Sequence, residues 1–161
     1  MKTALYLALG LLAVAFVLAQ FGLLGGSRPD DIGVRDSRLK PPSQTRNSIS
    51  SQAALYPDHP QRSDAEIKPF PLKNGSAADS LTALITALQT MPGITVVAHQ
   101  PDYVYAQART PWLKFVDDLE FWFNPALGTI DVRSASRLGR EDFGVNRQRM
   151  EAIRAAYLAQ P

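Results

Sequence analysis

Hydrophobic and polar residues are distributed differently in three parts of the 161-residue chain. Residues 1–27 are almost entirely apolar, and Lys2 is the only charged residue before Arg28. Residues 28–75 are polar and rich in proline, whereas residues 76–161 show the periodicities of helices and strands. We therefore predict a membrane anchor or signal peptide, then a proline-rich extended strap or linker, and then a compact domain.

The apolar run over residues 3–24 is long enough to cross a membrane. As a helix it would measure about 33 Å, against a hydrocarbon core of about 30 Å. An uncleaved anchor explains why the run continues to Leu24, whereas a signal peptide would be cut near residues 17–19. In the anchor interpretation Lys2 stays in the cytoplasm and the domain lies on the extracytoplasmic side. Cleavage would instead release the domain into the periplasm.

Seven of the twelve prolines lie between residues 28 and 75, where they prevent a long helix. The polar composition of this segment is typical of a linker, or of a strap that lies across the surface of a domain. We expect Ile67, Phe70 and Leu72 to fix its end to the core.

The compact domain is predicted to begin with a helix at Ser76, because Ser76 and Asp79 form a helix-start pattern. Pro92 and Gly93 end this helix. Short turn-like connections favour antiparallel pairing of the strands that come next. The strands are expected over residues 94–99, 103–110, 114–124 and 129–136, and a last helix over residues 144–159. This order predicts an α+β fold in which two helices cover one face of a four-stranded antiparallel sheet.

The third predicted strand carries the most informative charges. Alternation places Asp117 among large apolar side chains on one face, and Asp118 and Glu120 on the other. An unpaired carboxylate on an apolar face would cost several kcal/mol, so Asp117 needs a basic partner. Arginine suits this task because its planar guanidinium binds a carboxylate through two hydrogen bonds. The arginines expected on the neighbouring strands are Arg109, Arg133 and Arg137.

The sequence resembles the domain of unknown function 1499, a family of bacterial and plastid proteins. The resemblance rests on residues 115–121 and 132–149, and it extends to residues 42–53 and 67–69. Members often have a signal peptide, a lipobox or a membrane segment before the domain, and the resemblance implies no particular reaction. The family usually has a cysteine at the position of Ser48, so any family role that needs this thiol is excluded here.

The charged residues of this motif permit two interpretations. In one, six acidic and six basic side chains neutralise one another as an internal ion-pair network. In the other, some of them bind a ligand near the start of the last helix, where free N–H groups attract negative charge. We assign to the structural network Asp117, Arg109, Asp131, Glu141 and Asp142. We assign to the candidate ligand site Asp118, Glu120, Arg133, Arg137, Arg140, Asn146, Arg147 and Arg149.

Composition excludes several classes of function. The absence of cysteine excludes disulfides, thiolate metal sites and thiol nucleophiles. Seventeen basic residues against fifteen acidic ones, without a basic tail, give no indication of nucleic-acid binding. His59 and His99 stand alone, so we expect no metal site, and no pattern indicates a cofactor or a catalytic nucleophile.

We therefore predict an envelope-associated protein with a non-enzymatic binding or structural role. Its expected partners are the membrane, through residues 3–24, and a small anionic ligand or an envelope protein. The alternative is a hydrolase-like enzyme that uses Asp118, Glu120 and nearby arginines on a small polar or anionic substrate.

Overall fold

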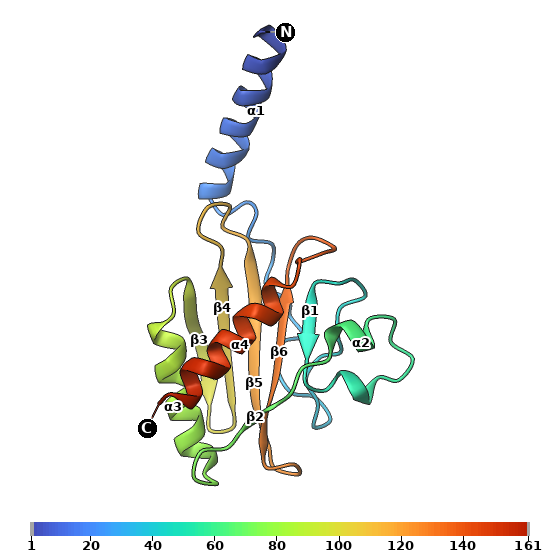
Figure 1. The fold of residues 1–161 in the computed structure, drawn as a ribbon, viewed down its shortest axis with the longest axis vertical. Helices are drawn as coiled ribbons and strands as arrows, with labels where there is room; N and C mark the ends of the chain where they lie inside the picture. The colour runs from blue at the N-terminus through green and yellow to red at the C-terminus, as the bar shows by residue number, and fades with distance from the viewer. Residues whose placement is uncertain (1, 161) are drawn as a thin grey trace.

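The chain folds around an antiparallel sheet that has six strands rather than the four expected from the sequence (Figure 1). The computed structural model describes residues 2–160. Four strands lie where alternation predicts them: β3 (Ile94–Gln100), β4 (Tyr103–Arg109), β5 (Val116–Asn124) and β6 (Thr129–Ser136). The two additional strands, β1 (Ser48–Ser50) and β2 (Phe70–Pro71), come from the proline-rich segment and both pair with β6. The order across the sheet is β1-β6-β5-β4-β3.

Two short helices add to those expected from the sequence, which were the N-terminal apolar helix and two helices in the domain. Residues 2–160 contain four α-helices, of which one, α2 (Arg62–Ala65), is a single turn. A short 3-10 helix, η1 (Ala53–Leu55), lies with α2 beside β1 at the edge of the sheet (Figure 1). The remaining helices are α1 (Lys2–Gln20), α3 (Ala77–Thr90) and α4 (Val145–Leu158).

The main hydrophobic core lies between the sheet and helices α3 and α4. Ser76 caps α3 as predicted, because its side chain accepts a hydrogen bond from the backbone N–H of Asp79 at 3.2 Å. Leucines of α3 and apolar residues of α4 meet the inward side chains of the strands. Phe70 of β2 stacks on Tyr157 of α4 with ring centroids 5.6 Å apart, so this short strand closes the core.

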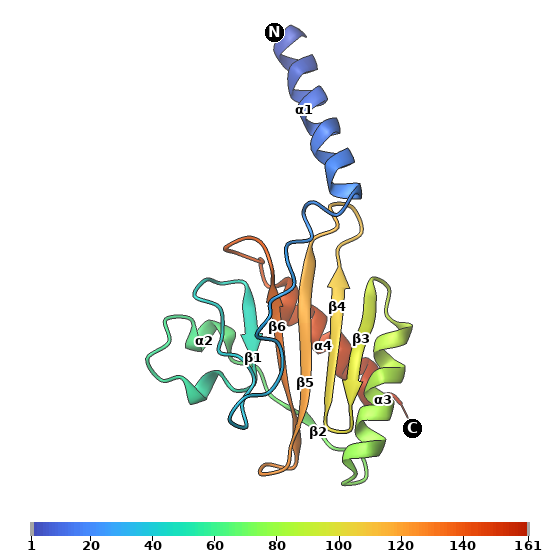
Figure 2. The same ribbon diagram turned by 180° about the vertical axis from the view of Figure 1, so that it is seen from behind.

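The opposite face of the sheet is covered by the chain between α1 and β1, which runs across β5 and β6 in Figure 2. Leu39 from this segment is buried in a second cluster with Tyr103, Tyr105 and Trp122. Residues of β4 and β5 are consequently buried on both faces. Charged side chains on the covered face therefore lie in a protein interior and need partners there.

Helix α1 is apolar and projects away from the rest of the domain (Figure 1). Its length and composition are sufficient for a membrane span, and a signal peptide would satisfy the same criteria. The N-terminal apolar helix expected from the sequence is therefore confirmed, and it is compatible with association with a membrane.

Candidate functional site

The pairing of β5 with β6 gathers five of the motif's charged residues on the covered face. Glu120 lies opposite Arg133, Asp118 opposite Ala135, and Trp122 opposite Asp131. The two-residue period then places Arg137 on the same face, just beyond the end of β6. We call this set the polar ladder; its members are Asp118, Glu120, Asp131, Arg133 and Arg137.

Arg137 binds Asp118 through both oxygens of the carboxylate. Its Nε lies 2.9 Å from Oδ2 and its Nη2 lies 2.7 Å from Oδ1. The Tyr105 hydroxyl also donates to Oδ1 at 2.6 Å. The hydrogen bond to Asp118 raises the pKa of Arg137 above its usual value, whereas burial is the main cause of a raised pKa at Tyr105. Arg137 therefore remains charged and Tyr105 remains neutral.

Glu120 is fully buried and is bound by three donors. Arg133 Nη1 lies 3.2 Å from Oε2, and the Tyr103 hydroxyl and the Gly33 backbone N–H each lie 2.9 Å from Oε1. Burial, and then the negative charge of Glu120, raise the pKa of Tyr103. Tyr103 therefore acts as a permanent hydrogen-bond donor to the carboxylate.

Asp131 is held by neutral donors. Ser51 Oγ donates to Oδ1 at 2.7 Å, and the side-chain amides of Gln52 and Asn124 each donate to Oδ2 at 2.8 Å. Gln52 also accepts a hydrogen bond from the backbone N–H of Leu39 at 2.7 Å. Asp131 thus links β6 to the chain that covers the sheet.

The ladder also holds the connection between α1 and the sheet. Arg137 Nη1 donates to the Gly26 carbonyl at 3.4 Å. Gly26 has a φ of 66°, and a Cβ at this position would lie 2.9 Å from the Cβ of Arg137, so only glycine fits. Since Gly33 is bound to Glu120 in addition, the chain that leaves α1 is attached to the sheet at several points.

The opposite face of the sheet carries Asp117, whose partner comes from a helix. Arg149 of α4 places Nη1 2.7 Å from Oδ2 of Asp117. The arginines of β6 do not reach Asp117 because Arg133 and Arg137 point to the covered face. The alternation that separates Asp117 from Asp118 is thus confirmed, but Asp117 is paired with an arginine other than those expected on the neighbouring strands.

Asn146, beside Arg149, is fully buried and uses both ends of its amide. Its Nδ2 donates to the Asn47 carbonyl at 3.1 Å, to Ser136 Oγ at 3.0 Å and to Asp142 Oδ2 at 2.8 Å. Its Oδ1 accepts from Ser134 Oγ and from Arg149. The side chain therefore joins β1, β6 and α4.

The amino terminus of α4 is occupied by the protein's own carboxylate. Asp142 accepts hydrogen bonds from the backbone N–H groups of Gly144 and Asn146, both at 3.0 Å. These are the groups that would receive an external anion at a helix start. The N-cap residue of this helix is Gly144, and the Asp142 carboxylate supplies the acceptors for its first N–H groups.

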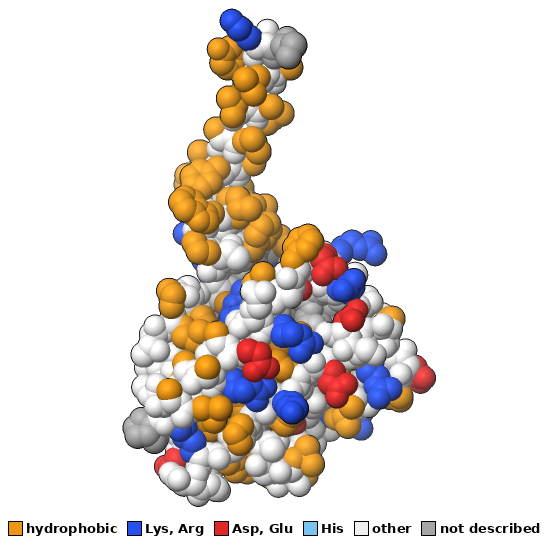
Figure 3. All heavy atoms as spheres, in the orientation of Figure 1, with side chains coloured by type: hydrophobic (Ala, Val, Ile, Leu, Met, Phe, Trp, Pro, Cys, Tyr) orange, Lys and Arg blue, Asp and Glu red, His pale blue; other side chains and the backbone are white. Residues whose placement is uncertain are grey.

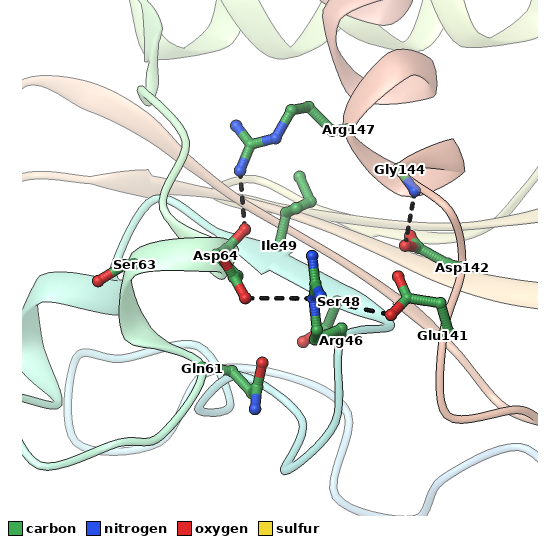
Figure 4. Close-up of a pocket in the computed structure, with 10 residues that line it drawn as sticks. All are labelled: Arg46, Ser48, Ile49, Gln61, Ser63, Asp64, Glu141, Asp142, Gly144 and Arg147. Atoms are coloured by element: carbon green, nitrogen blue, oxygen red, sulfur yellow. Dashed lines mark hydrogen bonds and ion pairs between the residues drawn. The ribbon is translucent and has the colours of Figure 1, made fainter.

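A cavity of about 310 Å³ lies between β1, α2 and the start of α4 (Figure 4). Arg46 contacts Asp64 at 3.2 Å and Glu141 at 3.6 Å across it. Arg147 donates from its other side to the carbonyls of Asp64 and Glu66, at 2.9 and 2.8 Å. The charged side chains that line this cavity are therefore bound to one another or to backbone groups.

Ser48 also lines this cavity (Figure 4). Its hydroxyl accepts a hydrogen bond from the Ser43 backbone N–H at 2.7 Å. Two arginines assigned from the sequence, Arg109 and Arg140, are exposed and form no ion pair within residues 2–160.

A second cavity, of about 400 Å³, lies beside the ladder under the covering chain. Asp118, Arg133 and Arg137 form its floor, and Lys40 lies at its wall. Arg133 is only 4% exposed, and its hydrogen bonds within residues 2–160 use Nε and Nη1. The Nη2 donors of a buried guanidinium therefore remain for an acceptor placed in this cavity.

Sequence reasoning missed several members of these networks. Tyr105 and Gln52 bind ladder carboxylates, Arg46 bridges two acids, and Asn47 meets Asn146. The position of Tyr105 could have been predicted from the alternation of residues along the strands. β4 and β5 are consecutive antiparallel strands, and their pairing sets Tyr105 opposite Glu120. Gln52, Arg46 and Asn47 come from the proline-rich segment, where no periodic pattern indicates which side chains face the sheet.

Together, the fold and the site define an α+β protein with an N-terminal apolar helix and a buried charged ladder. The chain belongs to the family described as protein of unknown function DUF1499, whose model matches residues 38–157. This confirms the family expected from the sequence, and the match includes every residue of the ladder. No curated protein and no solved structure matches the chain.

Proposed function

We propose that the protein is a membrane-tethered domain outside the cytoplasm that binds a small anion without chemical conversion. The observation that carries this proposal is the buried Arg133 at the floor of the ladder cavity, with Nη2 donors that no described residue uses. A guanidinium in such a position binds a carboxylate or phosphate more strongly than it would in water.

The side chains that line the cavity include more cations than carboxylates. Its floor and wall contribute three cationic side chains, Lys40, Arg133 and Arg137, and one carboxylate, Asp118. Glu120 compensates Arg133 from below. Asp31 binds Lys40 at 2.6 Å, and this hydrogen bond is the main cause of a lowered pKa at Asp31. Asp31 thus holds Lys40 in place at neutral pH, and it is itself half-exposed.

The hydrolase-like alternative has less support from the geometry. It requires Asp118 or Glu120 to exchange a proton with a substrate. All four carboxylate oxygens of these residues already accept hydrogen bonds from arginine, tyrosine or backbone donors. Neither acid therefore has a carboxylate oxygen that is free of a donor from the protein itself.

Titration of the full-length protein with inorganic phosphate, sulfate and small carboxylates should reveal saturable binding by calorimetry and a rise in melting temperature. Lys40→Ala should weaken binding about tenfold, equivalent to about 1.4 kcal/mol. The melting temperature of the free protein should change little, because a partly exposed pair contributes about 0–1 kcal/mol. Lys68→Ala removes a cation outside this cavity and serves as the matched control. Equal affinities of the two variants would contradict the proposed site.

The position of the domain relative to the membrane is testable with a topology reporter. Alkaline phosphatase fused after Gly26 in a bacterial host should be active, because α1 with Lys2 on the cytoplasmic side would export the residues C-terminal to it. A cytoplasmic reporter fused at the same position should be inactive. The reverse pair of activities would place the domain in the cytoplasm.

A further inference from the structure

Several exposed apolar side chains gather at the end of the domain from which α1 projects. Two loops lie there in both ribbon views: the β4–β5 loop and the loop between β6 and α4 (Figures 1 and 2). The first carries Trp112, which is 73% exposed, and Leu113. The second carries Leu138 and Phe143, and Phe143 is 86% exposed. We call these four residues the apolar rim.

The rim is in direct contact with the end of α1. Gln20, the last residue of the helix, donates from Nε2 to the Trp112 carbonyl at 2.8 Å. A Cβ at Gly25 would lie about 4.0 Å from the Lys114 carbonyl, so the chain after α1 passes close to the same loop. The loop that carries Trp112 therefore lies beside the C-terminal end of α1.

The C-terminal end of α1 would lie near the surface of a bilayer that α1 spans. The 19 residues of α1 reach about 28 Å, which nearly equals the thickness of a hydrocarbon core. The apolar sequence continues past Gln20 through Phe21 and Leu23, which are 80% and 63% exposed, and Figure 3 shows α1 covered with apolar side chains. Gln20 then lies at the membrane–water interface, the depth at which tryptophan is enriched.

The backbone and the charges of the two loops fit the same location. Phe143 and Lys114 have φ values of 53° and 58°, a conformation that costs about 1 kcal/mol or more in a residue other than glycine. Phe143 is held away from the core in this conformation. Arg109 and Arg140 are exposed at these loops and strand ends, and neither has an ion-pair partner among the described residues. Two such cations suit an anionic lipid surface.

We propose that the apolar rim inserts into the lipid headgroup region and seats the domain directly on the bilayer. This inference rests on the proposed membrane tether. A cavity of about 350 Å³ between the two loops would then open toward the lipid; apolar side chains such as Phe115, Leu138 and Val145 line it, together with the carboxylates of Asp117, Glu141 and Asp142. The attachment of residues 26–39 to the ladder keeps the domain in this orientation.

Because the chain contains no cysteine, single labelling sites are easily introduced. Full-length Phe143→Cys, labelled with an environment-sensitive fluorophore, is reconstituted in phosphatidylcholine vesicles with or without phosphatidylglycerol. Leu127→Cys is the matched control, because Leu127 is 68% exposed but lies in the β5–β6 turn at the opposite end of the sheet (Figure 1). We expect at least about twofold quenching by lipids that carry a quencher in the headgroup region at position 143, and none at position 127.

The two tryptophans give an independent measurement. In Trp122→Phe only Trp112 emits and should be quenched by the same lipids, whereas Trp122, which is buried, should not be quenched in Trp112→Phe. Retention on alkali-washed vesicles is measured in parallel and reports the tether alone. If the protein is retained on the vesicles but positions 112 and 143 are not quenched, the proposed insertion of the rim is wrong. A blue shift of the emission without quenching would also contradict it, because it indicates that protein rather than lipid covers the rim. Loss of the protein from washed vesicles would overturn the tether and the rim together.

Discussion

Replacing Arg133 with methionine should lower the free energy of unfolding by about 3–5 kcal/mol, the range for a buried ion pair that loses one partner. Glu120 is fully buried, and it would keep only the Tyr103 hydroxyl and the Gly33 N–H as donors. Methionine fills a similar volume, so the loss reports the uncompensated charge rather than a cavity. Urea unfolding of the full-length protein in detergent measures this change.

Two further variants identify the cause of the loss. Glu120→Gln combined with Arg133→Met should recover much of the stability, because the buried negative charge is then absent. Arg140→Met removes an exposed arginine from the same motif and should change stability by no more than about 0.5 kcal/mol. If Arg133→Met is as stable as Arg140→Met, the ladder is not a structural network.

The faces of the central strands were predictable because alternation is a local property. The sequence of β5 places Asp118 and Glu120 together, and a short turn to β6 brings Arg133 opposite Glu120. The structure adds that both faces are buried. That feature depends on where residues 28–47 lie, and a polar, proline-rich segment carries no periodic signal of its contacts.

Strands β1 and β2 were missed for a physical reason. They contain three and two residues, and β2 includes a proline. Their hydrogen bonds go to β6, with Ser48 opposite Ala135 and Phe70 opposite Ile130. Strands this short are defined by partners that are distant in the sequence, and their own residues do not reveal them.

The partner of Asp117 was equally inaccessible to local reasoning. A buried carboxylate on an apolar face requires a cation, and the sequence supplies several arginines. Which one arrives depends on how α4 crosses the sheet, a property of helix packing that brings Arg149 to Asp117. The residue type predicts that Asp117 needs a cationic partner, whereas the packing of α4 on the sheet determines which arginine that partner is.

Asn146 is the buried polar position of α4, and its replacement should lower the stability of the protein. Asn146→Ala should destabilise the protein by about 1–3 kcal/mol, because it leaves the buried Ser134 hydroxyl of β6 without a partner. Ser134 Oγ loses its hydrogen bond, the Asn47 carbonyl keeps only the one from the Ser136 backbone N–H at 2.9 Å, and Arg149 loses one of its contacts. Thermal and urea unfolding of the full-length protein provide the measurement.

Asn146→Asp should be at least as damaging although it preserves the shape. The new carboxylate would face the Asn47 carbonyl and Asp142 Oδ2, which now accept hydrogen bonds from the amide. Gln148→Ala, on the exposed side of the same helix, is the control and should leave stability within about 0.5 kcal/mol. Asn146 variants that retain full stability but lose anion binding would reassign this residue from the junction of three elements to a ligand site.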